Sequence, residues 1–463
     1  MHRLLAVVLC TLCLLPACTP EAPPADAVLL GRLFDSRQGQ VLEEGVVVLG
    51  EGRILCAGTP DDCRWPAGTP VHDYGQATLL PGLIDLHVHA RPHYVRAFLP
   101  SGITTVRDAN NTLATIDTLR STPGAPRILA SGPALDGPGS VLAGEPSPLG
   151  SQPLESLMPI TVTSAEDAAA AVLALHDAGT EWIKLYEQIP HDAFQSAVQT
   201  ANEAGIPVMA DLGLMLTRGL AGAEVDAVQA GTAGISTLEH LSGAALAYQR
   251  LGGDPLAGSL DDALLDQLAQ AIAATGMAVV PTAGTARQFH EPHALGLDDL
   301  PGAARVAPHF TGFWQHLEGV LAGEGPQSRS AADLRLASAL LPRLQAAGVA
   351  IGAGSDVPAA PRMLPGAALH QELDALVQAG LTPAQALQSA THTAASILGA
   401  DELGRIEAGA SADILVVDGD PLTNILHTRK VRAVWFQGTA VAVDAAWDEV
   451  ERTLQDAARE SGA

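Results

Sequence analysis

The sequence predicts an α/β protein: a (β/α)8 TIM-like barrel with a small β-sandwich domain built from both ends of the chain. Two observations predict the barrel. Apolar strand candidates alternate eight times with Ala/Leu-rich helical stretches, and polar residues stand where several of these strands end. A third observation predicts the smaller domain, because short β-runs with glycine turns occur near both chain ends. A doubly wound open sheet is the alternative for the central region.

The predicted β domain comprises residues 28–80 and 401–445. In its first part, the apolar run at residues 46–49 leads into Gly50-Glu51-Gly52 and a second run, which is typical of a hairpin. Its second part contains two further β-runs. We expect the two parts to pair in one unit, with the barrel inserted between them, and a helix over residues 446–463 to follow.

Residues 81–400 are expected to form the barrel. The functional residues of such barrels lie at the carboxyl ends of the strands, so each polar candidate should follow its strand closely. Two long connections, residues 132–163 and 283–328, are predicted to be functional or disordered loops. The eight strands are predicted at residues 83–89, 103–107, 127–131, 182–186, 208–211, 235–240, 278–282 and 349–354.

Residues 1–17 have the composition of a signal peptide for export. Residues 4–15 form an apolar stretch too short for a comfortable membrane span, and Leu15-Pro16-Ala17-Cys18 resembles a bacterial lipobox. The proline is unusual in that motif, so ordinary secretory cleavage is the alternative. We expect a tether over residues 18–27 and a protein exported to the bacterial periplasm or outer surface, attached to the membrane through a lipid on Cys18.

Composition restricts the partners of the protein. The formal net charge of −26 argues against nucleic acid as a ligand and favours neutral or cationic small-molecule substrates. Apart from Cys18, the chain after the signal contains Cys56 and Cys63, which could form a disulfide in an oxidising compartment or stay unpaired. They do not have zinc-finger spacing. The sequence does not indicate an oligomeric state.

The most informative stretch is Pro81-Gly82-Leu83-Ile84-Asp85-Leu86-His87-Val88-His89. Because successive side chains of a strand alternate between its faces, His87 and His89 should point the same way. Neutral imidazole is a common zinc ligand, so the pair can supply half of a metal site. The alternative is an ordinary strand with two partly exposed histidines.

Lys184 is one of two lysines among the 25 Lys and Arg residues of the chain. A composition so poor in lysine indicates that this position needs an amine. Arginine cannot lose its proton, whereas a partly buried lysine can. A neutral amine can add carbon dioxide to give a carbamate, whose two oxygens can bridge two cations. The alternative is an inward lysine in an ion pair.

Two further candidates end later strands. His240 follows the sixth predicted strand, and Asp356 follows the eighth, after Gly352-Ala353-Gly354-Ser355. The glycines allow close approach of the backbone, and the carboxylate can face the mouth of the barrel. The alternatives are a buried neutral histidine at position 240 and a helix N-cap at position 356.

These residues resemble, in order and strand number, the pattern of the amidohydrolase superfamily. The phrase from Pro81 to His89 is similar to that family's first barrel strand. Leu381-Thr382-Pro383-Ala384-Gln385-Ala386-Leu387, Gly404-Arg405-Ile406-Glu407-Ala408-Gly409 and Ala412-Asp413 resemble phrases of its imidazolonepropionase-like and prolidase-like branch. The resemblance covers about residues 28–441. It implies one metal ion on His87, His89 and Asp356, and a second on His240 and carbamylated, bridging Lys184.

Asp211 departs from the family pattern, in which the fifth strand ends in a histidine ligand. The sequence between His191 and His240 contains no histidine that could replace it. A carboxylate is a competent but harder ligand for zinc or manganese. We expect an altered site with two divalent ions, zinc or manganese. A one-metal site and a site without catalysis are the alternatives.

The resemblance implies hydrolysis of a C–N bond, amide or peptide, in a small substrate such as a dipeptide or an N-acyl amino acid, by metal-activated hydroxide. Asp356 is expected to move a proton to the leaving nitrogen, and Tyr186 to help hold the oxyanion. Lactones, esters and phosphotriesters are alternative substrates, and a binding lipoprotein impaired by Asp211 is an alternative of another class. Five residues of the second long connection could contact a substrate carboxylate: Arg287, His290, His293, His309 and His316. The alternative is that they belong to a solvated loop without such a role.

Overall fold

The computed structural model of the chain describes residues 24–140, 142, 146–147, 150–153, 158–220, 222–322 and 328–461. The predicted signal peptide, Cys18 and most of the predicted tether lie outside these ranges. No helix within them combines the length and the apolar character that a membrane-spanning helix requires.

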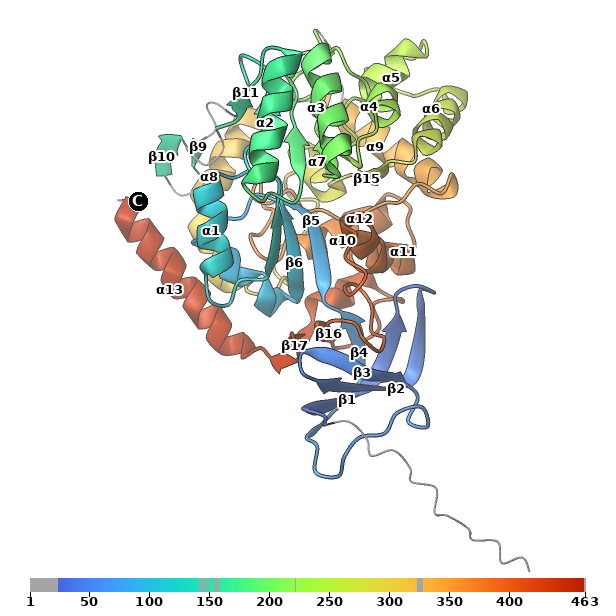
Figure 1. The fold of residues 1–463 in the computed structure, drawn as a ribbon, viewed down its shortest axis with the longest axis vertical. Helices are drawn as coiled ribbons and strands as arrows, with labels where there is room; N and C mark the ends of the chain where they lie inside the picture. Colours follow the sequence, from blue (N-terminus) through green and yellow to red (C-terminus); the bar gives the residue numbers. More distant parts are fainter. Residues whose placement is uncertain are drawn as a thin grey trace, which may run out of the picture.

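Strands from both ends of the chain form one seven-stranded sheet, at the bottom of the view in Figure 1. β4 pairs with β16 in antiparallel fashion, which places Leu80 opposite Leu415 although they lie near opposite ends of the sequence. The order across the sheet is β18-β17-β16-β4-β1-β2-β3. Its strands are β1 (Ala27–Asp35), β2 (Gln40–Gly50), β3 (Arg53–Gly58), β4 (Val71–Pro81), β16 (Ile414–Val417), β17 (Val431–Phe436) and β18 (Thr439–Ala440).

Both faces of this sheet carry buried apolar side chains, because successive residues of a strand point to opposite sides. In β2, Val47 and Leu49 belong to one apolar cluster, whereas Val48 packs with Cys63 in another. Cys63 is bonded to Cys56 in a disulfide, so the two cysteines are paired here. The seven strands belong to a single sheet, and the sandwich arrangement stays a prediction.

Two sheets of parallel strands occupy the middle of the chain. One has the order β5-β6-β7 and the other the order β11-β8-β12-β13-β14-β15. The N–H of Glu181, just before β12, donates to the carbonyl oxygen of Ala130 in β7 (3.1 Å) and joins the two sheets on one side. The strands are β5 (Leu83–Val88), β6 (Ile103–Asp108), β7 (Arg127–Ala130), β8 (Leu135–Asp136), β11 (Ile160–Thr161), β12 (Ile183–Leu185), β13 (Val208–Ala210), β14 (Thr237–Glu239) and β15 (Ala278–Val280).

The eighth predicted strand, residues 349–354, is not a regular strand in the structure. Ile351 forms an isolated parallel bridge with Val279 in β15. The N–H of Leu86 in β5 donates to the carbonyl oxygen of Ala353 (2.9 Å). The segment therefore lies between β15 and β5 and joins the two parallel sheets on their other side.

Glycines explain both the irregularity of this segment and its closeness to β5. A Cβ at Gly354 would lie 2.8 Å from the Cβ of His87, and one at Gly352 would lie 2.3 Å from Cδ1 of Leu86. Only glycine permits such an approach, and glycine also weakens a regular strand. The close approach expected from the sequence is therefore present, at the expense of strand regularity.

Helices cover the outer side of the parallel strands, as Figure 1 shows for α2, α3 and α4. In α3 the buried residues Phe194, Ala197, Val198 and Ala201 recur at the spacing of one helix face. The helices include α1 (Leu113–Ser121), α2 (Ala165–Asp177), α3 (His191–Ala204), α4 (Ala227–Ala233), α5 (Ala244–Arg250), α6 (Asp262–Thr275), α9 (Arg329–Ala346), α10 (Leu369–Gln378), α11 (Pro383–Ser389), α12 (His392–Leu398) and α13 (Val443–Ser461), with the 3-10 turns η1 (Val95–Ala97), η2 (Leu99–Ser101) and η5 (Ile425–Arg429).

The expectation that residues 283–328 form a loop is wrong, because this segment is largely helical. Its buried residues Val306, Phe310 and Trp314 recur every four positions, which is the period of a helix face. Within residues 132–163, the described parts include β8, β11 and the antiparallel pair β9 (Pro146–Ser147) and β10 (Gly150–Pro153). The helices of residues 283–328 are the short α7 (Ala283–His290) and the long α8 (Ala303–Leu321).

Candidate metal centre and its cavity

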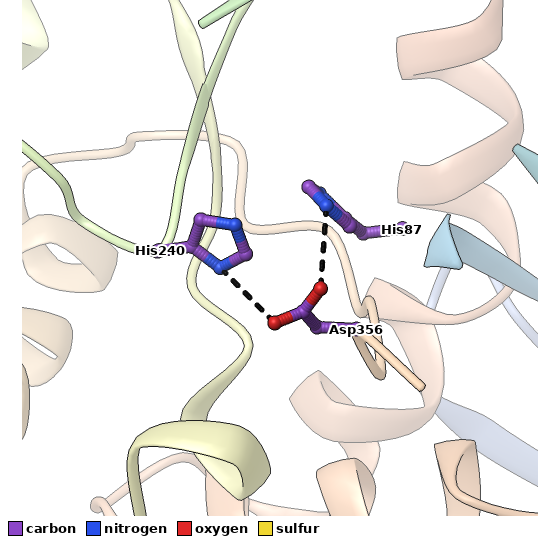
Figure 2. A group of neighbouring side chains, drawn as sticks. All are labelled: His87, His240 and Asp356. Atoms are coloured by element: carbon purple, nitrogen blue, oxygen red, sulfur yellow. Dashed lines mark ion pairs between the residues drawn. The ribbon is translucent and has the colours of Figure 1, made fainter. Parts of the chain in front are cut away.

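Three of the predicted ligand side chains form a tight cluster (Figure 2). One ligand atom from each of His87, His240 and Asp356 lies within 4.8 Å of the other two. Asp356 lies between the imidazoles. Its Oδ1 is 3.6 Å from Nε2 of His87, and its Oδ2 is 4.0 Å from Nδ1 of His240. The ends of β5 and β14 and the segment after Gly354 thus converge on one point.

Two more predicted ligands contact this cluster at its edges. Nε2 of His89 lies 3.1 Å from Oδ1 of Asp356, and Nε2 of His240 lies 3.4 Å from Oδ2 of Asp211. The predicted first-metal residues therefore meet at Asp356, and Asp211 meets the second-metal residue His240. The tightest cluster combines ligands from both predicted ions, so the division between two ions stays a prediction.

Lys184 lies inside β12 with only 1% of its surface exposed. Its Nζ has no hydrogen-bond partner among the described residues, so the ion pair considered as the alternative role is not present there. Burial, followed by the positive charge of Lys184, holds the pKa of His87 well below 6.5. His87 is therefore neutral, which is the form of imidazole that binds a metal ion.

Asp356 is kept ionised by its neighbours. Burial alone would raise its pKa, but the charge of His240, the hydrogen bond with His89 and the charges of His89 and Lys184 outweigh burial and hold the pKa of Asp356 below 3.8. A buried carboxylate in this state attracts cations and holds a proton only weakly.

A cavity of about 380 Å³ opens onto the cluster. Its volume suits a small-molecule ligand. Tyr186 lies in its lining, with the centre of its ring 5.7 Å from Nζ of Lys184. The other polar lining residues are His89, Arg91, Asn110, Lys184, Glu187, Asp211, Thr217, His240 and Asp356, and the apolar ones include Leu142, Leu214, Leu216, Phe289, Phe313, Leu317, Val320 and Leu321.

The residues expected to contact a substrate carboxylate do not line this cavity. His293 lines a different cavity, and Arg287 forms an ion pair with Glu291. The segment that carries them contributes apolar side chains instead, from α7 and α8. Helical periodicity therefore turns the apolar side chains of α7 and α8, and not the five polar candidates, towards the cavity.

The donor set fits a divalent metal ion. Nε2 of His87 and Nζ of Lys184 are buried polar atoms without a hydrogen-bond partner among the described residues. Such atoms are costly unless a ligand satisfies them. Imidazole nitrogens together with a carboxylate oxygen are typical zinc ligands.

Comparisons with known proteins agree with this geometry. The sequence model of the amidohydrolase family matches residues 78–441. The chain belongs to the amidohydrolase family. No curated protein matches it significantly.

Solved structures share the fold of this amidohydrolase. They include a putative prolidase from Bifidobacterium longum, with 23% identity, a TM-score of 0.66, and coverage of 92% of this chain and 100% of that one. A prolidase complexed with N-methylphosphonate-L-proline has 24% identity, a TM-score of 0.65, and coverage of 90% and 99%. A bottromycin amidohydrolase has 21% identity, a TM-score of 0.65, and coverage of 93% and 90%.

Glu239 and Arg107, to which the sequence analysis gave no role, hold the centre of this amidohydrolase in place. Glu239 Oε2 accepts a hydrogen bond from Nδ1 of His87 (2.5 Å), which leaves Nε2 directed at Asp356. Glu239 Oε1 in turn accepts from Nη2 of Arg107 (2.9 Å) and from the hydroxyl of Thr237 (2.5 Å). Charged residues within fully buried strands are the signal that could have revealed them.

Asp85, which lies inside the motif of the first strand, is a further residue without an assigned role. Its Oδ1 accepts hydrogen bonds from the backbone N–H groups of Ser355 (2.8 Å) and His87 (3.3 Å). Burial raises the pKa of Asp85 to about 7. These hydrogen bonds tie Ser355, the residue before Asp356, to β5. They thereby help to fix the distance between the side chains of Asp356 and His87.

The backbone of the amidohydrolase is strained around the cluster. His240, Thr282 and Asp356 have φ angles of 60°, 46° and 53°, a region that residues with a Cβ rarely adopt. Each such residue costs of the order of 1–3 kcal/mol and persists where its surroundings fix it. The hydroxyl of Thr282 lies 2.7 Å from Nδ1 of His240, so two strained residues hold each other.

Proposed function

We propose that this amidohydrolase is a metal-dependent enzyme that hydrolyses the C–N bond of a small amide, such as a dipeptide or an N-acyl amino acid. The observation that carries the proposal is the cluster of His87, His240 and Asp356 at a cavity of about 380 Å³, beside the unpartnered amine of Lys184. Membership of the amidohydrolase family supports hydrolysis of an amide bond at such a site.

The metal ligands divide into two groups. His87, His89 and Asp356 would hold one ion, and His240, Asp211 and a carbamate on Lys184 would hold the other. Zinc suits this mixture of nitrogen and oxygen donors, and manganese is the second choice. When bound, such ions supply an activated water molecule and polarise a carbonyl oxygen.

Asp356 moves the proton. Its Oδ1 lies 3.1 Å from Nε2 of His89 and 3.6 Å from Nε2 of His87, whereas its Oδ2 lies 4.0 Å from Nδ1 of His240. Oδ2 is therefore the freer oxygen, which accepts the proton of the attacking water and donates it to the leaving nitrogen. Tyr186, in the lining of the cavity, holds the oxygen of the tetrahedral intermediate.

The remaining expectations join this proposal. The two parallel sheets close into a TIM-like barrel, and the hydrogen bonds at Glu181 and Leu86 support closure on both sides. The protein is exported to the periplasm or outer surface and anchored by a lipid on Cys18. The disulfide between Cys56 and Cys63 supports export, because such bonds persist in oxidising compartments.

The test begins with the metal content of protein purified without chelators and with bicarbonate present. We expect about two zinc or manganese ions per chain by elemental analysis, and hydrolysis of members of a dipeptide and N-acyl amino acid series. Asp356→Asn should lower turnover by about 10²- to 10⁴-fold, the usual contribution of a general acid–base group.

Asp211→His is the informative companion variant, because it restores the histidine of the family pattern. One bound ion in the natural protein, with a second gained in Asp211→His, would replace the two-metal site by a mononuclear one. Bound metal without hydrolysis of any substrate tested, and without an effect of Asp356→Asn, would indicate a binding protein instead.

A further inference from the structure

Glu187 is a buried carboxylate that the proposed chemistry does not use. It lies just after β12, at the same end of the strand as Lys184, and it lines the cavity of the metal centre. Only 2% of its surface is exposed. Its Oε1 accepts a hydrogen bond from the hydroxyl of Thr217 (2.5 Å), whereas its Oε2 has no hydrogen-bond partner in the described part of the chain.

The surroundings of Glu187 are negative. Burial and the like charges of Asp211 and Asp136 raise the pKa of Glu187 to about 8, although the hydrogen bond from Thr217 and the charge of Arg218 oppose this rise. Asp136 is fully buried and accepts hydrogen bonds from the backbone N–H groups of Gly137 and Gln188, so it fixes the backbone next to Glu187. A buried carboxylate oxygen in such a place favours a cation that can donate a hydrogen bond.

The segment that supplies Thr217 is itself anchored. Asp333 in α9 accepts hydrogen bonds from the N–H groups of Met215 and Leu216, each at 2.9 Å. The side chains of Leu214 and Leu216 then join the apolar wall of the cavity. One corner of the cavity is thus an orientated carboxylate, and the adjoining wall is apolar.

We propose that Glu187 determines specificity by binding a primary ammonium group of the substrate, so that the enzyme prefers amides with a free amine beside a bulky apolar group. The ammonium donates a hydrogen bond to Oε2, and the apolar group packs on the wall formed by α7, α8 and residues 214–216. The inference rests on the proposed function for the amide bond, whereas recognition of the ammonium group is testable by binding alone.

The binding test compares phenethylamine with 2-phenylethanol, which has a neutral hydroxyl in place of the ammonium group. Calorimetry on the metal-loaded protein above pH 8, where Glu187 is ionised, should show roughly 10- to 100-fold tighter binding of the amine, the range for a hydrogen bond to a charged group. Glu187→Gln should bring the ratio of the two affinities close to one. Glu203→Gln, on the exposed side of α3, is the matched control and should keep the natural ratio.

Glu187→Asp provides a second variant should Glu187→Gln not fold. It keeps the charge but shortens the side chain. The ratio of its affinities for the amine and the alcohol should therefore fall between those of the natural protein and of Glu187→Gln. Binding of 2-phenylethanol to each variant reports whether the cavity is intact. An unchanged ratio in these variants, or no preference for the amine in the natural protein, would overturn the proposal.

A hydrolysis test separates this inference from the proposed function. It compares kcat/KM for L-phenylalanyl-L-alanine with that for 3-phenylpropanoyl-L-alanine, which lacks only the amine. Should neither be hydrolysed while the binding preference still depends on Glu187, the proposed function fails and the ammonium site stands. Should both be hydrolysed equally well with no binding preference, the ammonium site fails and the function stands.

Discussion

At the scale of single residues, each side chain of the metal centre is held by partners from other strands. Asp356 reaches His87 and His89 from one side and His240 from the other. His87 in turn is fixed through Glu239. The orientation of the ligands therefore depends on buried polar groups that would not touch the metal themselves, as is usual in metal sites.

Glu239→Gln tests this support. The substitution removes the negative charge that pairs with Nδ1 of His87 and with Arg107, while keeping the size of the side chain. We expect a loss of metal affinity of about 10- to 100-fold, the usual effect of removing a partner that orients a ligand. Competitive titration against a chromophoric chelator measures it. Glu181→Gln, at an exposed position, serves as control. Equal metal affinity in both variants would contradict the role of Glu239 in orienting His87.

The buried His370, which lies outside the candidate metal centre, leads us to expect that the stability of the protein depends on pH. It lies in α10, and its Nε2 is 2.9 Å from the carbonyl oxygen of Ser101. Burial lowers the pKa of His370 from 6.5 to about 4. Between these values the unfolded chain binds the proton and the folded chain does not. The free energy of unfolding therefore decreases as the pH falls from about 6.5 to about 4.

His370→Gln should remove this contribution, which amounts to about 1.4 kcal/mol per pH unit over that interval. Urea-induced unfolding at several pH values measures the slope for each protein. His191→Gln, on the exposed surface, controls for loss of a histidine. The same slope in His370→Gln as in the natural protein would show that His370 does not act in this way.

At the scale of elements, α8 separates two cavities. Phe313 and Leu317 on one face of α8 line the cavity of the metal centre, whereas Thr311 and Trp314 line a second cavity of about 680 Å³. One amphipathic helix thus supplies much of the apolar wall that a substrate would meet. The apolar wall of the cavity therefore comes largely from α8, whereas the candidate metal ligands come from the strand ends.

Phe313→Ala should weaken the binding of phenethylamine and 2-phenylethanol alike. The aromatic ring offers apolar area to both ligands, so we expect about a tenfold loss for each and an unchanged ratio between them. Calorimetry measures both affinities. Thr311→Ala, on the other face of α8, should bind both ligands as the natural protein does. A loss confined to the amine would place Phe313 outside the apolar wall.

At the scale of the whole molecule, the two chain ends hold the central part from outside. β4 runs directly into β5, and the N–H of Gly82 between them donates to the carbonyl oxygen of Asp413 (2.8 Å). Asp413 also forms an ion pair with Arg127 in β7 (2.9 Å). Figure 1 shows α13 leaving the small sheet and running along the outside of the molecule. Both ends thus brace the elements that carry the ligands and the cavity.

Trp447→Ala should weaken this bracing. Trp447 of α13 is buried against Gly302, at the start of α8, where a Cβ would lie 2.3 Å from the ring. We expect the free energy of unfolding to fall by about 3–5 kcal/mol, the usual cost of removing a buried aromatic side chain. Urea-induced unfolding provides the measurement.

Arg305→Ala is the matched control for that experiment. Arg305 pairs with Asp448 and Glu451 of α13, and these pairs are partly exposed to solvent. Exposed ion pairs contribute about 1 kcal/mol or less. Comparable losses in both variants would mean that charge, and not apolar packing, attaches α13 to α8.

Much of the metal centre could be predicted because its residues follow a local rule. His87, Asp211 and His240 lie at or near the ends of parallel strands, and Asp356 follows the irregular segment between β15 and β5, so that side chains from neighbouring segments meet there. Glu239 escaped prediction because its partner His87 lies in the other parallel sheet and 152 positions earlier in the sequence, so only the tertiary structure brings the two side chains together. Helix α8 escaped because its proline and glycines concealed its period.

The sequence by itself determined the family of this chain, the parallel strands and the side chains available to bind metal. These depend on patterns read within short windows, such as strand alternation and the phrase around His87. Only the tertiary structure decided that Asp356 lies between His87 and His240 and that the amine of Lys184 has no hydrogen-bond partner among the described residues. These contacts join residues far apart in sequence, and their geometry depends on sheet order and on the close approach of the backbone at Gly354.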